Sequence, residues 1–170
     1  MNASTAYATS DDFCRIFSEE MNSLYLLGLL LTADPAKAEQ SFVAGIGDSV
    51  EGNAVFREWA RSWARRTIIQ HAIRMIEPAH EKLRIANPIP ASLEIEPRLM
   101  AILELADLER FAFVMSVLEG YSYQDCSTLL GCSRQDVVNA RTRALEQLAK
   151  AAELVATDGE RLPGAYTLVS

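Results

Sequence analysis

The stretch LEGYSYQDCSTLLGCSRQDVVNARTR, residues 118–143, contains the start signals of two helices and a turn between them. Ser122 and Ser133 are each followed three residues later by an aspartate. At this spacing the serine oxygen accepts a hydrogen bond from the first helical turn, and the acid stabilises the positive end of the helix. Gly131 lies between the two signals, where glycine typically ends a helix. The stretch therefore predicts a helix-turn-helix unit.

The second helix of this unit carries side chains that suit the major groove of DNA. Arginine and amide side chains can each make two hydrogen bonds to a purine edge, and the recognition helix of a helix-turn-helix lies in that groove. The DNA-binding residues that we expect on this helix are Arg134, Gln135, Val138, Asn139, Thr142 and Arg143. Within this set Arg143, together with Lys150 further along the helix, suits contacts to phosphate.

Proline divides the chain into two parts. Pro78, Pro88, Pro90 and Pro97 interrupt a segment with little periodicity, and proline removes the N–H that a helix would use. Small polar residues or glycine and proline mark both ends of the chain. The sequence therefore predicts, in order, a flexible tail at 1–12, a helical domain at 13–86, a linker at 87–96, a second helical domain at 97–155 and a C-terminal tail at 156–170.

Apolar spacing predicts three helices in the first domain. From Phe13 to near Thr32 apolar residues recur at steps of three and four, which indicates one amphipathic helix. Asp34 and Pro35 then have the residue types that begin a helix. Glycines 45, 47 and 52 are expected to break this second helix, and a third follows over 55–76.

The second domain adds two helices before the helix-turn-helix unit. One is short and extends from Pro97 to about Leu105, and the other is capped by Asp107 and ends at Gly120. No segment alternates in the manner of a strand. The predicted fold class is therefore all-α, with two small helical domains.

Both halves resemble a known family. Residues 118–125 and 129–133 are similar to region 4 of sigma-70 transcription initiation factors of the extracytoplasmic-function type, which have a leucine-glutamate-glycine-x-serine-tyrosine segment and a leucine-glycine-cysteine-serine turn. Residues 24–39 resemble the start of region 2 of the same family, and residues 56–74 resemble its DNA-facing helix. The two regions occur in the family's order and are separated by the predicted linker.

The resemblance implies a division of promoter recognition between the domains. The first domain would bind core RNA polymerase and open the −10 element, and the second would read the −35 element. In the first domain this implies a DNA-binding set of Trp59, Arg61, Arg65 and Arg66, and a polymerase-binding set of Glu39, Gln40 and Val43. Arginines beside aromatic rings can hold a single strand by charge and stacking. We expect Trp63 in the core, since large aromatic residues at helical spacing usually pack there.

Some positions depart from the family's pattern. Where the family has an acid and then a glutamine-glutamate pair that binds polymerase, this chain has Gln40, Val43 and Ala44. The alternative is therefore a degenerate sigma-like module that binds a protein partner or DNA and has lost polymerase binding. Arg141 occupies the place of a buried leucine, so we expect Ala140 and Ala144 to take over its packing.

Charge is unevenly distributed along the chain, whose net charge is −7. From residue 11 to 55 eight acidic residues oppose two basic ones, whereas from 56 to 84 seven basic residues oppose three acidic ones. A basic segment suits nucleic acid and an acidic one suits a protein surface. The expected partners are core RNA polymerase and promoter DNA, with an anti-sigma protein as a further candidate.

Catalytic and metal-binding patterns are missing from the sequence. It has no glycine-rich phosphate loop, no H-E-x-x-H and no G-x-S-x-G motif, and its three cysteines do not have zinc-ligand spacing. We therefore expect a protein that is not an enzyme and has no cofactor and no metal. The apolar run of residues 24–31 is too short to cross a membrane, which indicates a cytoplasmic protein without membrane insertion.

Overall fold

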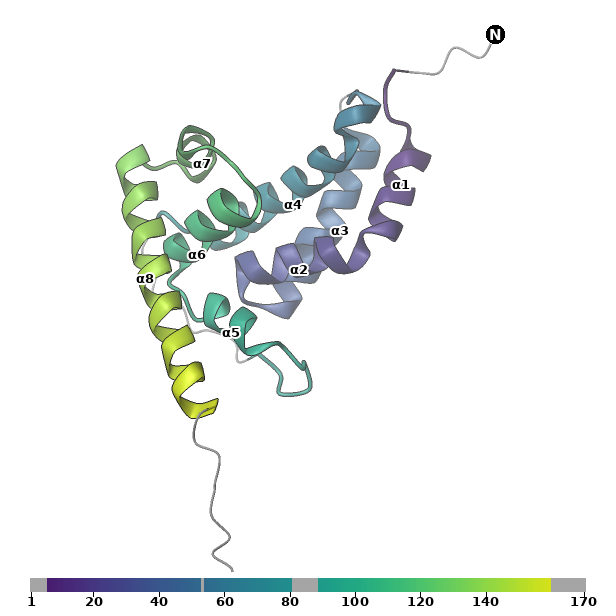
Figure 1. The fold of residues 1–170 in the computed structure, drawn as a ribbon. Coiled ribbons are helices and arrows are strands. Elements are labelled where there is room, and N and C mark those ends of the chain that lie inside the picture. The colour runs from purple at the N-terminus through teal and green to yellow at the C-terminus, as the bar shows by residue number, and fades with distance from the viewer. Residues whose placement is uncertain (1–5, 53, 81–88, 160–170) are drawn as a thin grey trace, which may run out of the picture.

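The computed structural model describes residues 6–52, 54–80 and 89–159, and within these residues the chain is all-α, as predicted (Figure 1). The first unit contains α1 (Ser10–Glu19), α2 (Met21–Thr32), α3 (Pro35–Glu51), the 3-10 turn η1 (Arg57–Trp59) and α4 (Ala60–Ile76). The second unit contains α5 (Pro97–Leu103), α6 (Asp107–Phe113), the π-helical turn η2 (Val114–Leu118), α7 (Tyr123–Leu130) and α8 (Arg134–Gly159).

The N-terminal segment is more ordered than the predicted tail at 1–12. α1 begins at Ser10, because Thr9 forms a capping box in which the Asp12 N–H donates to the Thr9 hydroxyl and the Thr9 N–H donates to the Asp12 carboxylate. The Ala8 N–H also donates to the Val55 carbonyl at 2.7 Å. These bonds hold residues 8–12 against the first unit, so the predicted boundary of the tail is wrong.

The predicted single helix over residues 13–32 is also wrong, because it is two helices. The chain leaves the helical conformation at Glu20, whose φ is −104° and ψ is 16°. α1 buries one apolar stripe. α2 is apolar on most of its circumference and buries seven residues between Leu24 and Thr32. A straight helix would point part of these faces at solvent, and the break lets both pack on α3 and α4.

α3 begins as predicted, because the Asp34 carboxylate accepts the N–H groups of residues 36 and 37 and Pro35 occupies the first turn. The predicted break at glycines 45 and 47 is wrong, since α3 continues to Glu51. A Cβ at Gly45 would lie 3.0 Å from the Ile68 side chain and 3.1 Å from the Thr67 hydroxyl. Gly45 therefore allows α3 and α4 to approach closely, and only Gly52 ends the helix.

The second unit packs α6 and α8 around Phe111, which is fully buried. Ala140 and Ala144 are also fully buried, which confirms that they provide the packing beside Arg141. Asp107 does not cap α6 with its side chain as predicted; it is the first helical residue, and its carboxylate accepts a hydrogen bond from Arg110 at 2.5 Å.

Two predicted boundaries in this half need correction. α5 ends at Leu103 rather than near Leu105, and α8 continues to Gly159, past the predicted tail boundary at 156. Residues 81–88, which include the start of the predicted linker, lie outside the described part. In the described part of the predicted linker, Ile89 and Ile95 pack against the hydrophobic core.

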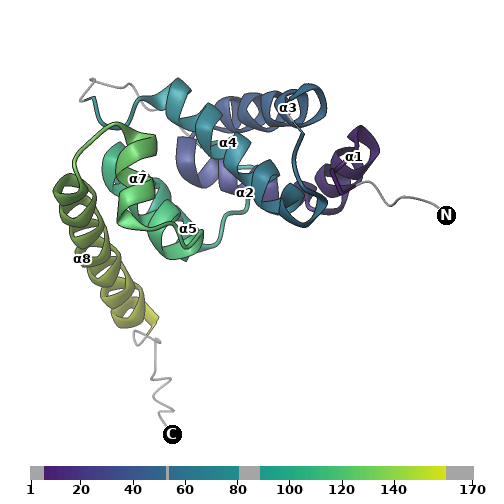
Figure 2. The same cartoon turned by 90° about the horizontal axis from the view of Figure 1, so that it is seen from above.

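The two units pack against each other. Seen from above, the helices run from α8 at one side through α5 and α7 to α1 at the other (Figure 2). Arg110 of α6 is 3% exposed and its Nε donates to the Leu31 carbonyl at the end of α2 at 3.0 Å. Its Nη1 donates to the Leu105 carbonyl at 2.7 Å. A buried arginine therefore joins the end of α2 to the second unit.

Candidate nucleic-acid interface

α7 and α8 form the predicted helix-turn-helix. Ser122 caps α7 and accepts the Asp125 N–H at 3.1 Å, and Gly131 ends α7 with a φ of 68°, in the left-handed region that favours glycine. At the start of α8 the Ser133 hydroxyl accepts the Asp136 N–H at 3.0 Å, and the Asp136 carboxylate accepts the Ser133 N–H at 3.0 Å. Hydrogen bonds from the Ser133 side chain and backbone lower the pKa of Asp136. Both capping signals in the sequence are confirmed.

The start of α8 exposes most of the predicted DNA-binding residues. Arg134, Gln135 and Asn139 are exposed, and the Gln135 side-chain amide donates to the Asn139 side-chain oxygen at 2.9 Å. Thr142 is exposed one turn further along, whereas Val138 is half-buried. These polar side chains form a row along one side of the helix, as a recognition helix requires.

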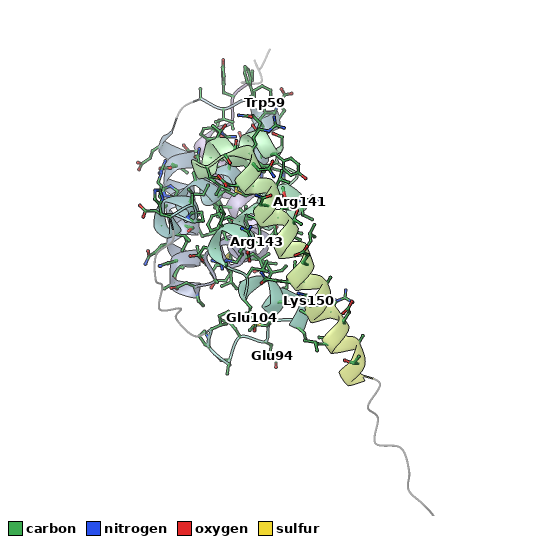
Figure 3. The ribbon with its side chains drawn as sticks, turned by 90° about the vertical axis from the view of Figure 1, so that its left-hand side faces the viewer. Trp59, Glu94, Glu104, Arg141, Arg143 and Lys150 are labelled. Carbon is green, nitrogen blue, oxygen red and sulfur yellow. The ribbon has the colours of Figure 1, made fainter. Side chains whose placement is uncertain are left out.

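Arg143 has a partner within its own unit. Its Nε donates to the Glu109 carboxylate at 2.8 Å, and Gln147 donates to the other oxygen of Glu109 at 2.8 Å. Figure 3 shows Arg141, Arg143 and Lys150 at successive levels along α8. The structure therefore ties Arg143 to α6, and the sequence motif contains no signal of this contact.

Trp59, a predicted DNA-binding residue of the first unit, belongs to an exposed aromatic cluster with Tyr7 and Phe56, which were not in the predicted set. Tyr7 stacks on Phe56 with ring centroids 4.8 Å apart, and Trp59 meets Phe56 edge to face at 5.3 Å. Trp59 is 57% exposed and lies at the top of the view in Figure 3. Trp63 is half-buried and packs against the core, as expected. Exposed rings of this kind can stack with bases.

Two of the three predicted arginines on α4 are paired with acids of this chain. Arg61 donates to Glu20 and, at 2.9 Å, to Glu19. Arg65 makes two hydrogen bonds to the Glu119 carboxylate, at 2.7 and 2.6 Å, which raise the pKa of Arg65. In the described part of the chain Arg66 has no hydrogen bond or ion pair.

The pair of Arg65 with Glu119 crosses between the units, from α4 to the segment before α7. Glu119 belongs to the leucine-glutamate-glycine segment, and no pattern in the sequence indicates this contact. A depression of about 350 Å³ next to this pair is lined by residues of both units, among them Trp59, Arg66 and Tyr121. The basic face of α4, which carries Arg61, Arg65 and Arg66, is thus partly covered by the second unit.

The residues predicted to bind polymerase lie together on α3. Glu39, Gln40 and Val43 line an open depression of about 500 Å³ with two alanines. Val43 is 60% exposed, so this surface includes an aliphatic side chain that faces solvent. The structure brings these three residues to one surface, which also includes apolar side chains.

The described residues hold no group of three or more metal-ligating side chains. Cys126 is buried, and this burial raises the pKa of its thiol to about 11, so the thiol is neutral at physiological pH. Within the part of the chain that the structure describes, no helix has the length and apolar character of a membrane span.

The second unit is similar to a known protein family. An all-α chain with a capped helix-turn-helix belongs to a class that includes many DNA-binding regulators. Residues 99–148, which contain this unit, match the family described as sigma-70, region 4. This family likeness extends over the second unit, from within α5 to within α8.

No curated protein matches the chain. Among solved structures it is similar to the sigma factor RpoE of Bartonella quintana, which was crystallised in complex with the anti-sigma factor NepR. The two share 19% sequence identity with a TM-score of 0.49, over 84% of this chain and 98% of that chain.

Proposed function

We propose that this protein is a transcription initiation factor of the extracytoplasmic-function type, which binds core RNA polymerase and recognises promoter DNA. The observation that carries the proposal is the row of Arg134, Gln135 and Asn139 on a capped helix of the sigma-70 region 4 unit. These side chains have the donors and acceptors that read purine edges in the major groove. The second unit would read the −35 element with this row.

In this proposal the first unit binds core RNA polymerase and the −10 element. The depression lined by Glu39, Gln40 and Val43 is the surface for polymerase, and the aromatic cluster with Arg66 is the surface for a separated DNA strand. Charge and base stacking together favour single strands. An anti-sigma protein is a further proposed partner, and such a partner would act by covering one of these surfaces.

Promoter binding requires the two units to separate. The −10 and −35 elements lie roughly 25 base pairs apart, which at about 3.4 Å per base pair is on the order of 80 Å. In the structure Arg65 of the first unit and Glu119 of the second are 2.6 Å apart. The packed arrangement is therefore a DNA-free state, and engagement of both elements breaks the contact between the units.

Specific observations also favour the alternative, a degenerate sigma-like module that has lost polymerase binding. The proposed polymerase surface is lined by the apolar Val43 and Ala44, where the family resemblance implies glutamine and glutamate. Arg61 and Arg65 are neutralised by acids of the same chain. In this case the acidic first unit would bind a protein partner, and the chain would bind without supporting transcription.

Binding of the purified full chain to bacterial core RNA polymerase, with run-off transcription in the same reconstituted sample, separates the two functions. Tight binding with promoter-specific transcripts supports the initiation factor. Duplex binding without polymerase binding supports the degenerate module and contradicts the first proposal.

Replacement of Ala44 by glutamate should tighten polymerase binding by about two- to fivefold, the range expected of one exposed ion pair. Ala44 lines the proposed surface, and glutamate is the residue that the family resemblance implies there. Binding is measured by titration of labelled core polymerase with each variant. Ala149→Glu, which adds the same charge at an exposed position of α8, is the matched control, and equal binding by A44E, A149E and the wild type would exclude this surface.

Replacement of Arg134 and Asn139 by alanine should weaken binding to a duplex selected by the wild-type chain. Each good base contact contributes about 1–3 kcal/mol of discrimination against a wrong base pair. Fluorescence anisotropy with the selected duplex and a shuffled duplex measures the loss. Glu153→Ala, exposed near the far end of α8, is the control. Equal discrimination by the double variant would remove the recognition-helix assignment.

A further inference from the structure

A pocket of about 500 Å³ lies between the start of α7 and the first turns of α8. Arg134 and Arg141 contribute its two charged side chains, and its lining contains no carboxylate. The other lining residues all carry hydroxyl or amide groups and are Ser116, Tyr121, Ser122, Tyr123 and Gln124. The pocket thus combines two positive charges with several hydrogen-bonding groups.

Arg141 is held in one orientation in this pocket. Its Nη1 donates to the Tyr123 hydroxyl at 2.8 Å, and its guanidinium lies over the Tyr123 ring, 5.7 Å from the centroid. This contact combines a cation–π attraction with a hydrogen bond and fixes the plane of the guanidinium. The Nε of Arg141 is buried without a hydrogen-bond partner. Because this nitrogen has no contact with solvent, a ligand in the pocket would have to bind the terminal nitrogens of the guanidinium.

The chemistry of this pocket fits a phosphate. A guanidinium presents a planar set of donors that matches two phosphate oxygens, and two arginines without a nearby carboxylate in the lining leave positive charge to be neutralised. In the described part of the chain Arg134 has no ion pair. The Asp125 carboxylate is engaged by the Ser122 hydroxyl at 2.6 Å.

The position of the pocket fits a phosphate of the DNA backbone. When a recognition helix lies in the major groove, the preceding helix crosses the backbone at the groove's edge. The pocket is formed where α7 begins, beside Arg134, the first residue of α8. A duplex read by the row of Arg134, Gln135 and Asn139 therefore brings a backbone phosphate to this side of the unit.

We infer that this pocket binds one phosphate of the DNA backbone and that Arg141 is its principal contact. The inference rests on the proposed function, because it requires that α8 enter a DNA groove. Arg141 stands where the family resemblance implies a buried leucine, so this contact would be an addition of this chain. It would contribute affinity and register, and no discrimination between base sequences.

Arg141→Leu in the full chain tests this inference. Leucine is the residue implied by the family resemblance, so the variant should fold. Binding to a labelled 20-base-pair duplex of arbitrary sequence and to a selected duplex is measured over a potassium chloride series. Loss of one phosphate contact should make the slope of log K against log salt shallower by about 0.9 and weaken both duplexes by the same factor. Arg98→Leu, which removes the same charge from exposed Arg98 on α5, should leave the slope unchanged.

The outcomes separate this inference from the proposed function. An unchanged slope in R141L overturns the assignment of the phosphate. Inorganic phosphate could instead stabilise the wild type against heat but not R141L, while the salt slopes of the two proteins are equal. That result would assign the pocket to a free anion and would also overturn the inference. A shallower slope on the arbitrary duplex supports the inference even if the chain fails to bind polymerase, since this measurement involves neither polymerase nor a promoter.

Discussion

Replacement of Arg110 by alanine should lower the free energy of unfolding by about 3–5 kcal/mol, the loss expected when one member of a buried ionic group is removed. Arg110 is 3% exposed and donates to two backbone carbonyls, those of Leu31 and Leu105, and to the Asp107 carboxylate. Alanine leaves these acceptors without this donor in the interior, where an unsatisfied polar group is costly. Urea unfolding followed by circular dichroism measures the change.

The control for this variant is Arg98→Ala, which removes an exposed arginine of α5 and should change the free energy of unfolding by less than about 0.5 kcal/mol. A loss below about 1 kcal/mol for R110A would contradict the role of Arg110 as the buried connection between α2 and the second unit. The two variants have the same net charge, so a difference between them reports position and burial rather than charge.

The helix-turn-helix was predictable because its signals are local. Each serine and the aspartate three residues later lie within one helical turn, and Gly131 determines the turn by its own backbone conformation. Asp34 and Pro35 likewise start α3 with contacts to their immediate neighbours. The cap predicted at Asp107 is a local signal that failed, because Asp107 is the first residue of α6 and its carboxylate accepts a hydrogen bond from Arg110 instead.

The errors in the first unit arise from packing between helices. Gly45 looks like a helix breaker in the sequence, but its missing side chain is what lets α4 approach α3. Residues 13–32 have one continuous helical pattern, but the two helices that result need different directions to cover the core. Such requirements depend on segments that are distant in the sequence, so local periodicity does not contain them.

The charge segregation seen in the sequence has a different meaning in the structure. The acidic stretch and the basic stretch were expected to face different partners, a protein and a nucleic acid. In the structure they partly neutralise each other, since Arg61 pairs with Glu19 and Glu20 and Arg57 pairs with Asp12. Arg65 pairs with Glu119, 54 residues further along the chain. No sequence pattern within a domain predicts a contact of that separation.

Replacement of Glu119 by glutamine should tighten binding of the full chain to single-stranded DNA by about tenfold at low salt. In the wild type, Arg65 has to give up two hydrogen bonds to the Glu119 carboxylate before it can meet a phosphate. A hydrogen bond to a charged group contributes about 1.5–3 kcal/mol, and 1.4 kcal/mol corresponds to a tenfold change in affinity. Glutamine keeps the shape of the side chain but removes its charge. Fluorescence anisotropy with a labelled single strand measures the affinity.

Removal of any carboxylate makes the chain more positive and favours DNA binding in general, so the control for E119Q has to carry the same charge change. Glu104→Gln, at an exposed position just after α5, meets this condition and should tighten binding by much less. Because the expected gain depends on Arg65, it should disappear when E119Q is combined with Arg65→Ala, as a double-mutant cycle would reveal. If E119Q and E104Q tighten binding equally, or if the gain survives without Arg65, the pair between the units does not compete with DNA. The packed arrangement would then hold the units together without restraining the basic face of α4.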